Sequence, residues 1–171
     1  VTTRLLDDGH HVHCLIRNSE QQDALTTRGI TVTVGDATSE EDMKQCITEA
    51  KEHGEINGLL HCVGSIVIRP PHALNKDAFE EVITTNLTSA FLALSIAGKA
   101  MLRQGSGRMV FSSSVAGSLG LVNHEAIAAA KGGIEAMVRA SAATYARRGL
   151  RINAVAPGLT DTKMASKILS S

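Results

Sequence analysis

The sequence predicts an α/β domain with a Rossmann-like, doubly wound and mostly parallel sheet. Short stretches rich in β-branched residues alternate with longer amphipathic stretches along the 171 residues. Parallel strands need a crossover connection, and each amphipathic stretch is long enough to supply one as a helix. Polar residues or glycine follow most of the strand-like stretches, as in sheets that bind ligands beyond the carboxyl ends of their strands.

Five stretches have the length and composition of strands. They cover 10–17, 30–36, 56–64, 108–114 and 150–157. Strands of this kind, separated by helices, predict a parallel order in which all the carboxyl ends lie at one edge of the sheet.

The segments between these strands have helical patterns. They cover 19–29, 38–54, 76–103 and 123–148. Gly29 ends the first helix, and Thr38 or Ser39 caps the second, whose first turn is acidic. The chain opens with the pattern of a helix that Gly9 closes. We therefore expect residues 1–171 to form a single, incomplete Rossmann-like domain.

Composition excludes several classes of function. The chain has 17 basic and 17 acidic residues and no basic cluster, which argues against a nucleic-acid partner. Only 2% of its residues are aromatic, so little is present on which bases could stack. No uninterrupted apolar run is long enough to span a bilayer, so no membrane partner is expected.

The cysteines and histidines give no sign of a disulfide framework or a metal site. The three cysteines are scattered and form no CxxC motif, which is typical of reduced thiols. His11, His13, His61 and Asp36 follow or begin neighbouring strands, but no motif adds a further ligand, so no metal is expected. Without a signal peptide, the chain is predicted to be cytoplasmic.

Residues 1–171 contain no glycine-rich phosphate-binding loop of the kind usual in such sheets. The segment "GSGR" (105–108) precedes a strand, so it does not present backbone N–H groups at the start of a helix. There is also no GxxxxGK[ST] motif.

Five motifs together resemble the short-chain dehydrogenase/reductase family over nearly the whole of residues 1–171. They are "GDAT" (35–38), "TTNLTSAF" (84–91), "SSSVAG" (112–117), "AAAKGG" (128–133) and "RINAVAPGLTDT" (151–162). Each motif alone is weak, but their order and spacing are specific. The resemblance implies an NAD(P)(H)-dependent oxidoreductase that acts on an alcohol or carbonyl substrate.

The resemblance assigns catalytic roles to residues at the matching positions. Asn86 would hold a catalytic water, and Ser114 would polarise the substrate oxygen. Lys131 would bind the nicotinamide ribose and lower the pKa of a tyrosine hydroxyl. The spacing from Ser114 to Lys131 fits the Ser, Tyr, Lys arrangement of the family.

Other positions would bind the cofactor. Asp36, followed by Ala37, would approach the adenine ring, and Gly64 would let the backbone pass close to the cofactor. Arg17 would pair with a 2′-phosphate, which favours NADP over NAD. The residues implied to flank the nicotinamide are Pro157, Gly158 and Thr162.

Simpler interpretations remain open for several of these residues. Asp36 could start a turn that caps the following helix, and Arg17 could be a solvated strand end. The serines of 112–114 could form a polar strand terminus. Asn86 is a poor helix former inside an apolar helix, so it needs hydrogen-bond partners if it is buried.

The sequence departs from the family pattern at four places. The tyrosine expected four residues before Lys131 is Ile127, and the one tyrosine, Tyr145, lies near the far end of that helix. The family's Asn-Asn-Ala-Gly reads His61-Cys62-Val63-Gly64. The first strand with its glycine-rich loop and the last strand are also missing, so we expect a fragment of a longer gene product. In the family, that first strand lies between the strands at 10–17 and 56–64. We therefore expect one of three arrangements at this place: a gap filled by a partner chain, direct pairing of the two strands, or further residues upstream that supply the strand.

His124 is the nearest candidate to replace the tyrosine. It lies three residues before Ile127 and seven before Lys131, on the same helix face. A histidine exchanges protons near neutral pH without help from a lysine. His124 could instead simply begin the helix, with Glu125 complementing the helix dipole.

Three hypotheses follow. The chain is an oxidoreductase with an unconventional acid, a dinucleotide-binding or scaffold protein without turnover, or a truncated fragment that needs association for stability. In the family, the helices expected at 76–103 and 123–148 form a four-helix bundle, so the resemblance implies a homodimer or homotetramer.

Overall fold

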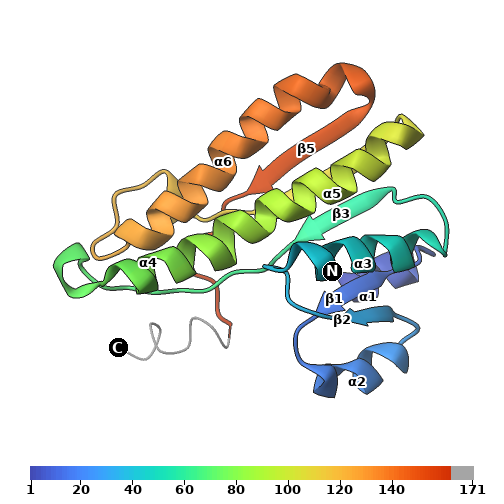
Figure 1. Cartoon of the computed structure of the whole chain (residues 1–171), viewed down its shortest axis with the longest axis horizontal. Helices are drawn as coiled ribbons and strands as arrows, with labels where there is room; N and C mark the ends of the chain where they lie inside the picture. The colour runs from blue at the N-terminus through green and yellow to red at the C-terminus, as the bar shows by residue number, and fades with distance from the viewer. Residues whose placement is uncertain (163–171) are drawn as a thin grey trace.

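The computed structural model describes residues 1–162 and confirms the α/β fold with parallel sheets (Figure 1). A two-stranded sheet pairs β1 (His13–Ile16) with β2 (Thr31–Val34). A three-stranded sheet has the order β3 (Gly58–His61), β4 (Gly107–Ser112) and β5 (Leu150–Val155). All three pairings are parallel, so the strands of each sheet end at a common edge.

The two sheets are not joined by strand pairing. Within residues 1–162, β1 pairs with β2 alone and β3 pairs with β4 alone, so each keeps one unpaired edge. The family resemblance implied a missing strand between the strands at 10–17 and 56–64, and of the alternatives expected for this place, direct closure of the two strands does not occur within residues 1–162. Ala37, Met43 and Ile47 nevertheless share one apolar core with the helices that cover the larger sheet.

The shorter helices follow the predicted positions with smaller bounds. They are α1 (Thr2–Asp7), η1 (Ser19–Gln21), α2 (Gln22–Thr26) and α3 (Glu40–Lys51). The Ser39 hydroxyl accepts a hydrogen bond from the Asp42 N–H and so caps α3 as predicted. At the end of α2, the hydroxyls of Thr26 and of the C-cap residue Thr27 donate to carbonyls one turn back.

The longer predicted helices carry interruptions. After η2 (Pro71–Ala73), α4 (Lys76–Ile83) runs into a π-helical turn, η3 (Thr84–Thr88), and then into α5 (Ser89–Gln104). After η4 (Val115–Gly117), α6 (Glu125–Tyr145) is followed by η5 (Ala146–Arg148). The predicted helix 76–103 is therefore continuous in space but not uniformly α-helical.

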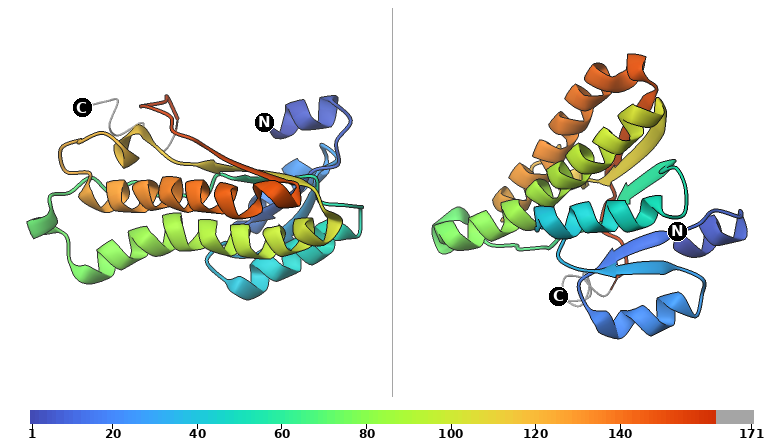
Figure 2. Two further views of the ribbon diagram at one scale, coloured as in Figure 1. Left: turned by 90° about the horizontal axis from the view of Figure 1, so that it is seen from above. Right: turned by 45° about the vertical axis from the view of Figure 1, so that its right-hand side comes forward.

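The helices α5 and α6 lie side by side on one face of the β3–β4–β5 sheet (Figures 1 and 2). Met109 and Phe111 of β4 are fully buried against Ala97 and Met101 of α5 and against Ile134 of α6. By length and composition alone, the run Lys76–Gln104 would also suit a membrane span. Seven of the sixteen residues of α5 are buried in the protein, which accounts for its apolar character.

Candidate active site

Lys131 reaches from α6 to the carboxyl end of β4. Its side chain is buried, with 8% of the residue exposed, and its Nζ donates a hydrogen bond to the Ser112 carbonyl at 2.8 Å. Burial lowers the pKa of Lys131, and the nearby Cys62 thiol opposes that shift. One of the three ammonium N–H donors is thus used by the protein, and it fixes the direction of the side chain.

Asn86 lies in the π-helical turn and is completely buried. Its Nδ2 donates to the Val82 carbonyl at 2.9 Å and to the Ser65 hydroxyl at 3.1 Å. Its Oδ1 accepts from the Ser65 backbone N–H at 3.2 Å. The partners that a buried asparagine needs therefore come from its own helix and from the segment after β3.

Gly64 lies where Asn86 and Lys131 meet. A Cβ atom at this position would lie 2.8 Å from Asn86 Oδ1 and 3.4 Å from Lys131 Nζ. The first of these distances is too short for any side chain without a shift of Asn86. The structure thus brings together three residues that the sequence placed in three different motifs.

The three serines after β4 have different roles. The Ser114 hydroxyl accepts from the Ala116 N–H at 3.2 Å and caps η4, so its proton is free of that bond. Ser113 is buried, and its hydroxyl lies 3.1 Å from the Lys131 carbonyl and 2.8 Å from Glu135 Oε1. The sequence did not distinguish Ser113, which joins the end of β4 to α6 beside Lys131.

Paired glycines hold the Ser114 turn close to α6. A Cβ atom on Gly117 would lie 2.9 Å from the Gly132 backbone nitrogen, and one on Gly133 would lie 2.8 Å from the Leu87 side chain. The "GG" that follows Lys131 therefore admits η4 on one side and the π-helical turn on the other.

Ile127 fills an apolar cluster one turn before Lys131. It is 4% exposed and packs with Val82, Ala116, Ala126 and Ala130. Its side chain has no proton to exchange, so this position contributes packing alone.

His124 is the N-cap residue of α6 and is half-buried. Its Nδ1 donates to the Val122 carbonyl at 2.6 Å, so in the neutral ring Nε2 is the proton acceptor. This bond is local, and within residues 1–162 no hydrogen bond joins the His124 side chain to Ser114 or Lys131. Its role in proton transfer remains a prediction.

Arg17 and Asp36 follow the neighbouring strands β1 and β2. Arg17 is exposed, and its charge contributes to the lowered pKa of Asp36. The larger causes are hydrogen bonds to Asp36 Oδ1 from the backbone N–H of Thr38, at 2.8 Å, and from its hydroxyl, at 2.7 Å. Asp36 thus makes the turn that was its simpler interpretation, and the Ala37 side chain packs in the core. Contact of either residue with an adenine ring remains a prediction.

The segment after β5 lies beside the Ser114 turn. The Pro157 carbonyl accepts from the Val115 N–H at 3.0 Å, and the Gly158 carbonyl accepts from the Thr160 hydroxyl at 3.2 Å. Gly158 and Thr162 are exposed. All three predicted nicotinamide-flanking residues therefore follow β5, at the carboxyl edge of the sheet.

His61 is a buried polar residue whose contacts the sequence did not predict. It ends β3, is 4% exposed, and its Nε2 lies 3.0 Å from the Ser89 hydroxyl. Burial, with help from the Lys131 charge, lowers its pKa to about 4, so the ring is neutral at pH 7. The one sequence feature that could have pointed to a buried His61 is its place at the end of an apolar strand.

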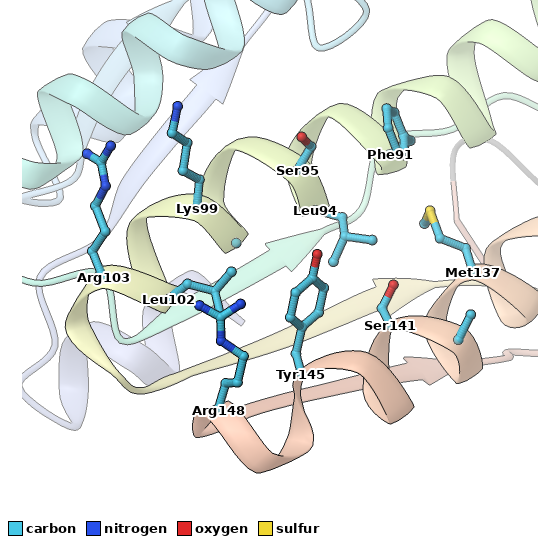
Figure 3. A pocket seen from close by; sticks show the side chains of 12 residues that line it. Phe91, Leu94, Ser95, Lys99, Leu102, Arg103, Met137, Ser141, Tyr145 and Arg148 are labelled. Carbon is cyan, nitrogen blue, oxygen red and sulfur yellow. The ribbon is translucent and has the colours of Figure 1, made fainter.

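A groove of about 650 Å³ lies between α5 and α6, away from these residues (Figure 3). Leu94, Leu102, Met137 and Tyr145 contribute to its lining, and Phe91 at its rim is 56% exposed. Tyr145 is thus a groove residue near the end of α6, as expected, and lies far along the helix from Lys131.

These features define an α/β protein of the Rossmann type, with a polar site built from a lysine, an asparagine and a glycine at the carboxyl edge of its sheet. The chain belongs to the short-chain dehydrogenase/reductase family. A family model described as enoyl-(acyl carrier protein) reductase matches residues 1–171.

Individual relatives agree with this assignment. The chain is 35% identical over 158 residues to 2-(S)-hydroxypropyl-CoM dehydrogenase 3 of Xanthobacter autotrophicus, covering 90% of this chain and 62% of that protein. The crystal structure of levodione reductase superposes with a TM-score of 0.91 at 32% identity, over 98% of this chain and 69% of that one. For NAD⁺-bound xylitol dehydrogenase the TM-score is 0.89 at 28% identity, over 98% and 67%. The chain thus spans roughly two thirds of the length of these relatives.

Proposed function

We propose that this chain supplies the cofactor site of an NAD(P)(H)-dependent oxidoreductase that acts on a small alcohol or carbonyl compound. The observation that carries the proposal is the meeting of Gly64, Asn86 and Lys131 beside the serines that end β4. A buried ammonium group next to a backbone without a Cβ atom suits a ribose, whose hydroxyls accept hydrogen bonds and whose ring needs close approach.

The residues present fit a nicotinamide dinucleotide. Lys131 donates one N–H to the Ser112 carbonyl, so the other two N–H groups of its ammonium can donate to ribose hydroxyls. The exposed Arg17 guanidinium at the end of β1 suits a 2′-phosphate. A bound dinucleotide would give or take the hydride, while the Ser114 hydroxyl would donate a hydrogen bond to the substrate oxygen.

NADP is proposed in preference to NAD because of Arg17. The xylitol dehydrogenase neighbour carries NAD⁺, so the fold by itself does not choose between the two. Titration of the chain with NADPH and with NADH, followed by nucleotide fluorescence, tests the choice. Arg17→Ala should weaken NADPH binding roughly tenfold and leave NADH binding unchanged, whereas equal loss for both would refute this role.

The proton of the reaction needs a source other than residue 127. We infer that His124 Nε2, directly or through water, exchanges the proton with the substrate oxygen that Ser114 holds. Because His124 Nδ1 is committed to the Val122 carbonyl, the neutral ring has its basic nitrogen at the opposite position.

Stopped-flow oxidation of NADPH with a panel of carbonyl compounds tests the activity. His124→Ala should abolish turnover while NADPH affinity stays intact, and His10→Ala, at an exposed histidine before β1, is the matched control. Full turnover in His124→Ala would remove His124 from the mechanism.

The second candidate function is dinucleotide binding without turnover. It is favoured by Ile127, which occupies the expected tyrosine position as a packed apolar residue. NADPH binding with no oxidation by any carbonyl compound in the panel would support this function over the first.

We further propose that copies of the chain associate through the exposed faces of α5 and α6, as a homodimer or homotetramer in the cytoplasm. The apolar groove between these helices and the exposed ring of Phe91 support such an interface.

A further inference from the structure

The π-helical turn that carries Asn86 leaves one backbone carbonyl to be satisfied by a side chain. In an α-helix, the Ser89 N–H would donate to the Thr85 carbonyl four residues back. Here the Ser89 N–H donates to Thr84, five residues back, and the Ser89 hydroxyl donates to the Thr85 carbonyl at 2.6 Å. The serine side chain thus replaces the backbone donor that the π-turn diverts.

His61 completes this arrangement from the neighbouring strand. A serine hydroxyl has one proton, and that of Ser89 is used on Thr85, so Ser89 Oγ accepts from His61 Nε2 at 3.0 Å. This assigns the proton of the neutral imidazole to Nε2. His61 Nδ1 is then a bare acceptor, and it is buried without a hydrogen-bond partner within the described residues.

We propose that His61 is a positioning residue that acts through Ser89 to hold Asn86 at the candidate active site. The chain of contacts runs from the end of β3 through the two side chains to the π-turn. By fixing the Ser89 rotamer, His61 keeps the π-turn in the one register that aims the Asn86 amide at Ser65 and Gly64.

This inference rests on the proposed function only in assigning Asn86 to an active site. The positioning itself is a property of the folded chain and is measurable without cofactor or turnover. A chain that binds no dinucleotide would refute the proposed function and leave the contact between His61 and Ser89 to be tested separately.

Two substitutions at His61 separate donation from packing. In His61→Gln the side-chain amide nitrogen extends about as far as the imidazole Nε2, so it can still donate a hydrogen bond to Ser89 Oγ. In His61→Asn the amide nitrogen lies at the position of Nδ1 and falls short of Ser89. Ser89→Ala removes the acceptor, and Ser141→Ala, a buried serine of α6, is the control.

The readout is the exchange rate of the Asn86 side-chain amide protons in ¹⁵N-labelled full chain. We expect His61→Asn and Ser89→Ala each to accelerate this exchange roughly tenfold. His61→Gln and Ser141→Ala should match the wild-type rate. The double variant His61→Asn/Ser89→Ala should exchange no faster than Ser89→Ala alone, because both changes break one chain of contacts.

The imidazole ¹⁵N spectrum of the unmodified chain gives an independent test that needs no variant to fold. We expect the Nε2–H tautomer, with Nδ1 unprotonated. A protonated Nδ1 in the neutral ring would overturn the proposal, as would a wild-type Asn86 exchange rate in folded His61→Asn.

Discussion

Acidification is predicted to destabilise the protein in part through His61. The ordinary pKa of a histidine is 6.5, and burial in the folded chain lowers that of His61 to about 4. Between these values the unfolded chain binds a proton that the folded chain excludes. The stabilising contribution of His61 is therefore complete above pH 6.5 and is lost as the pH falls toward 4.

The size of this effect follows from the two pKa values. Each pKa unit corresponds to about 1.36 kcal/mol, so the whole shift is worth about 3 kcal/mol, and about 2 kcal/mol of it is lost between pH 7 and pH 4.5. For a protein with a typical free energy of unfolding of about 5–15 kcal/mol, this loss is easily measured. The nearby Lys131 charge acts in the same direction as burial, since both lower the His61 pKa.

Urea unfolding at pH 7.0 and pH 4.5, for the wild type and for His61→Gln, isolates the effect. The other titratable groups, including the half-buried His13 whose pKa is lowered by burial, are common to both proteins and cancel in the difference. The wild type should lose about 2 kcal/mol more than His61→Gln, with m-values unchanged. Equal losses in the two proteins would refute the reasoning.

Three further changes test the site and its surroundings. Gly64→Ala places a Cβ atom against Asn86 Oδ1 and should lower the free energy of unfolding by about 1–3 kcal/mol; an unchanged urea midpoint would contradict the close approach. Ile127→Tyr should raise the rate of NADPH-dependent carbonyl reduction at least about 100-fold by supplying a proton donor, although overpacking should cost about 1–3 kcal/mol of stability; a stopped-flow rate equal to the wild type would argue against this role for position 127. Phe91→Ser removes an exposed ring beside the α5–α6 groove and should shift the molar mass measured by light scattering toward the monomer, whereas an unchanged mass would place the interface elsewhere.

The strand pattern located the five strands found within residues 1–162, but it overestimated their lengths. The stretch 56–64 predicted a strand, whereas β3 covers only Gly58–His61. Periodicity detects apolar character, while strand pairing requires a neighbour, and β3 has one on a single side within residues 1–162. Residues 62–64 leave the sheet and become part of the site, which a local pattern does not distinguish from a strand.

Asn86 was the most informative single residue in the sequence. As a poor helix former within an apolar helix, it was expected to need hydrogen-bond partners if buried, and in the structure it is buried and makes three hydrogen bonds. The π-turn was not predicted, because one extra residue in a helical turn changes the apolar period too little to be read from one sequence. The connection from Ser89 to His61 needs that turn, so it was also outside the reach of the pattern.

The serines and glycines show the same limit at closer range. Only the family resemblance distinguishes Ser114 from Ser112 and Ser113 in the sequence. In the structure Ser113 is buried and the other two are half-buried, because strand alternation and the turn at η4 point the side chains in different directions. Gly132 belongs to the "AAAKGG" motif, but the reason for a glycine there depends on Gly117, fifteen residues earlier, which faces it across the turn.

Binding and turnover make different demands on this site, and the chain meets them unequally. Close approach to a cofactor needs backbone without side chains and a fixed cation, and we propose that Gly64 and the buried Lys131 supply these. Proton transfer needs a titratable group within hydrogen-bond reach of the substrate oxygen, and at position 127 the chain has a packed isoleucine instead. Since these two sets of residues are separate, dinucleotide affinity should respond to Lys131 and Gly64 and be indifferent to His124. A variant series that lowered affinity and turnover in constant proportion would show that the two functions share one set of groups.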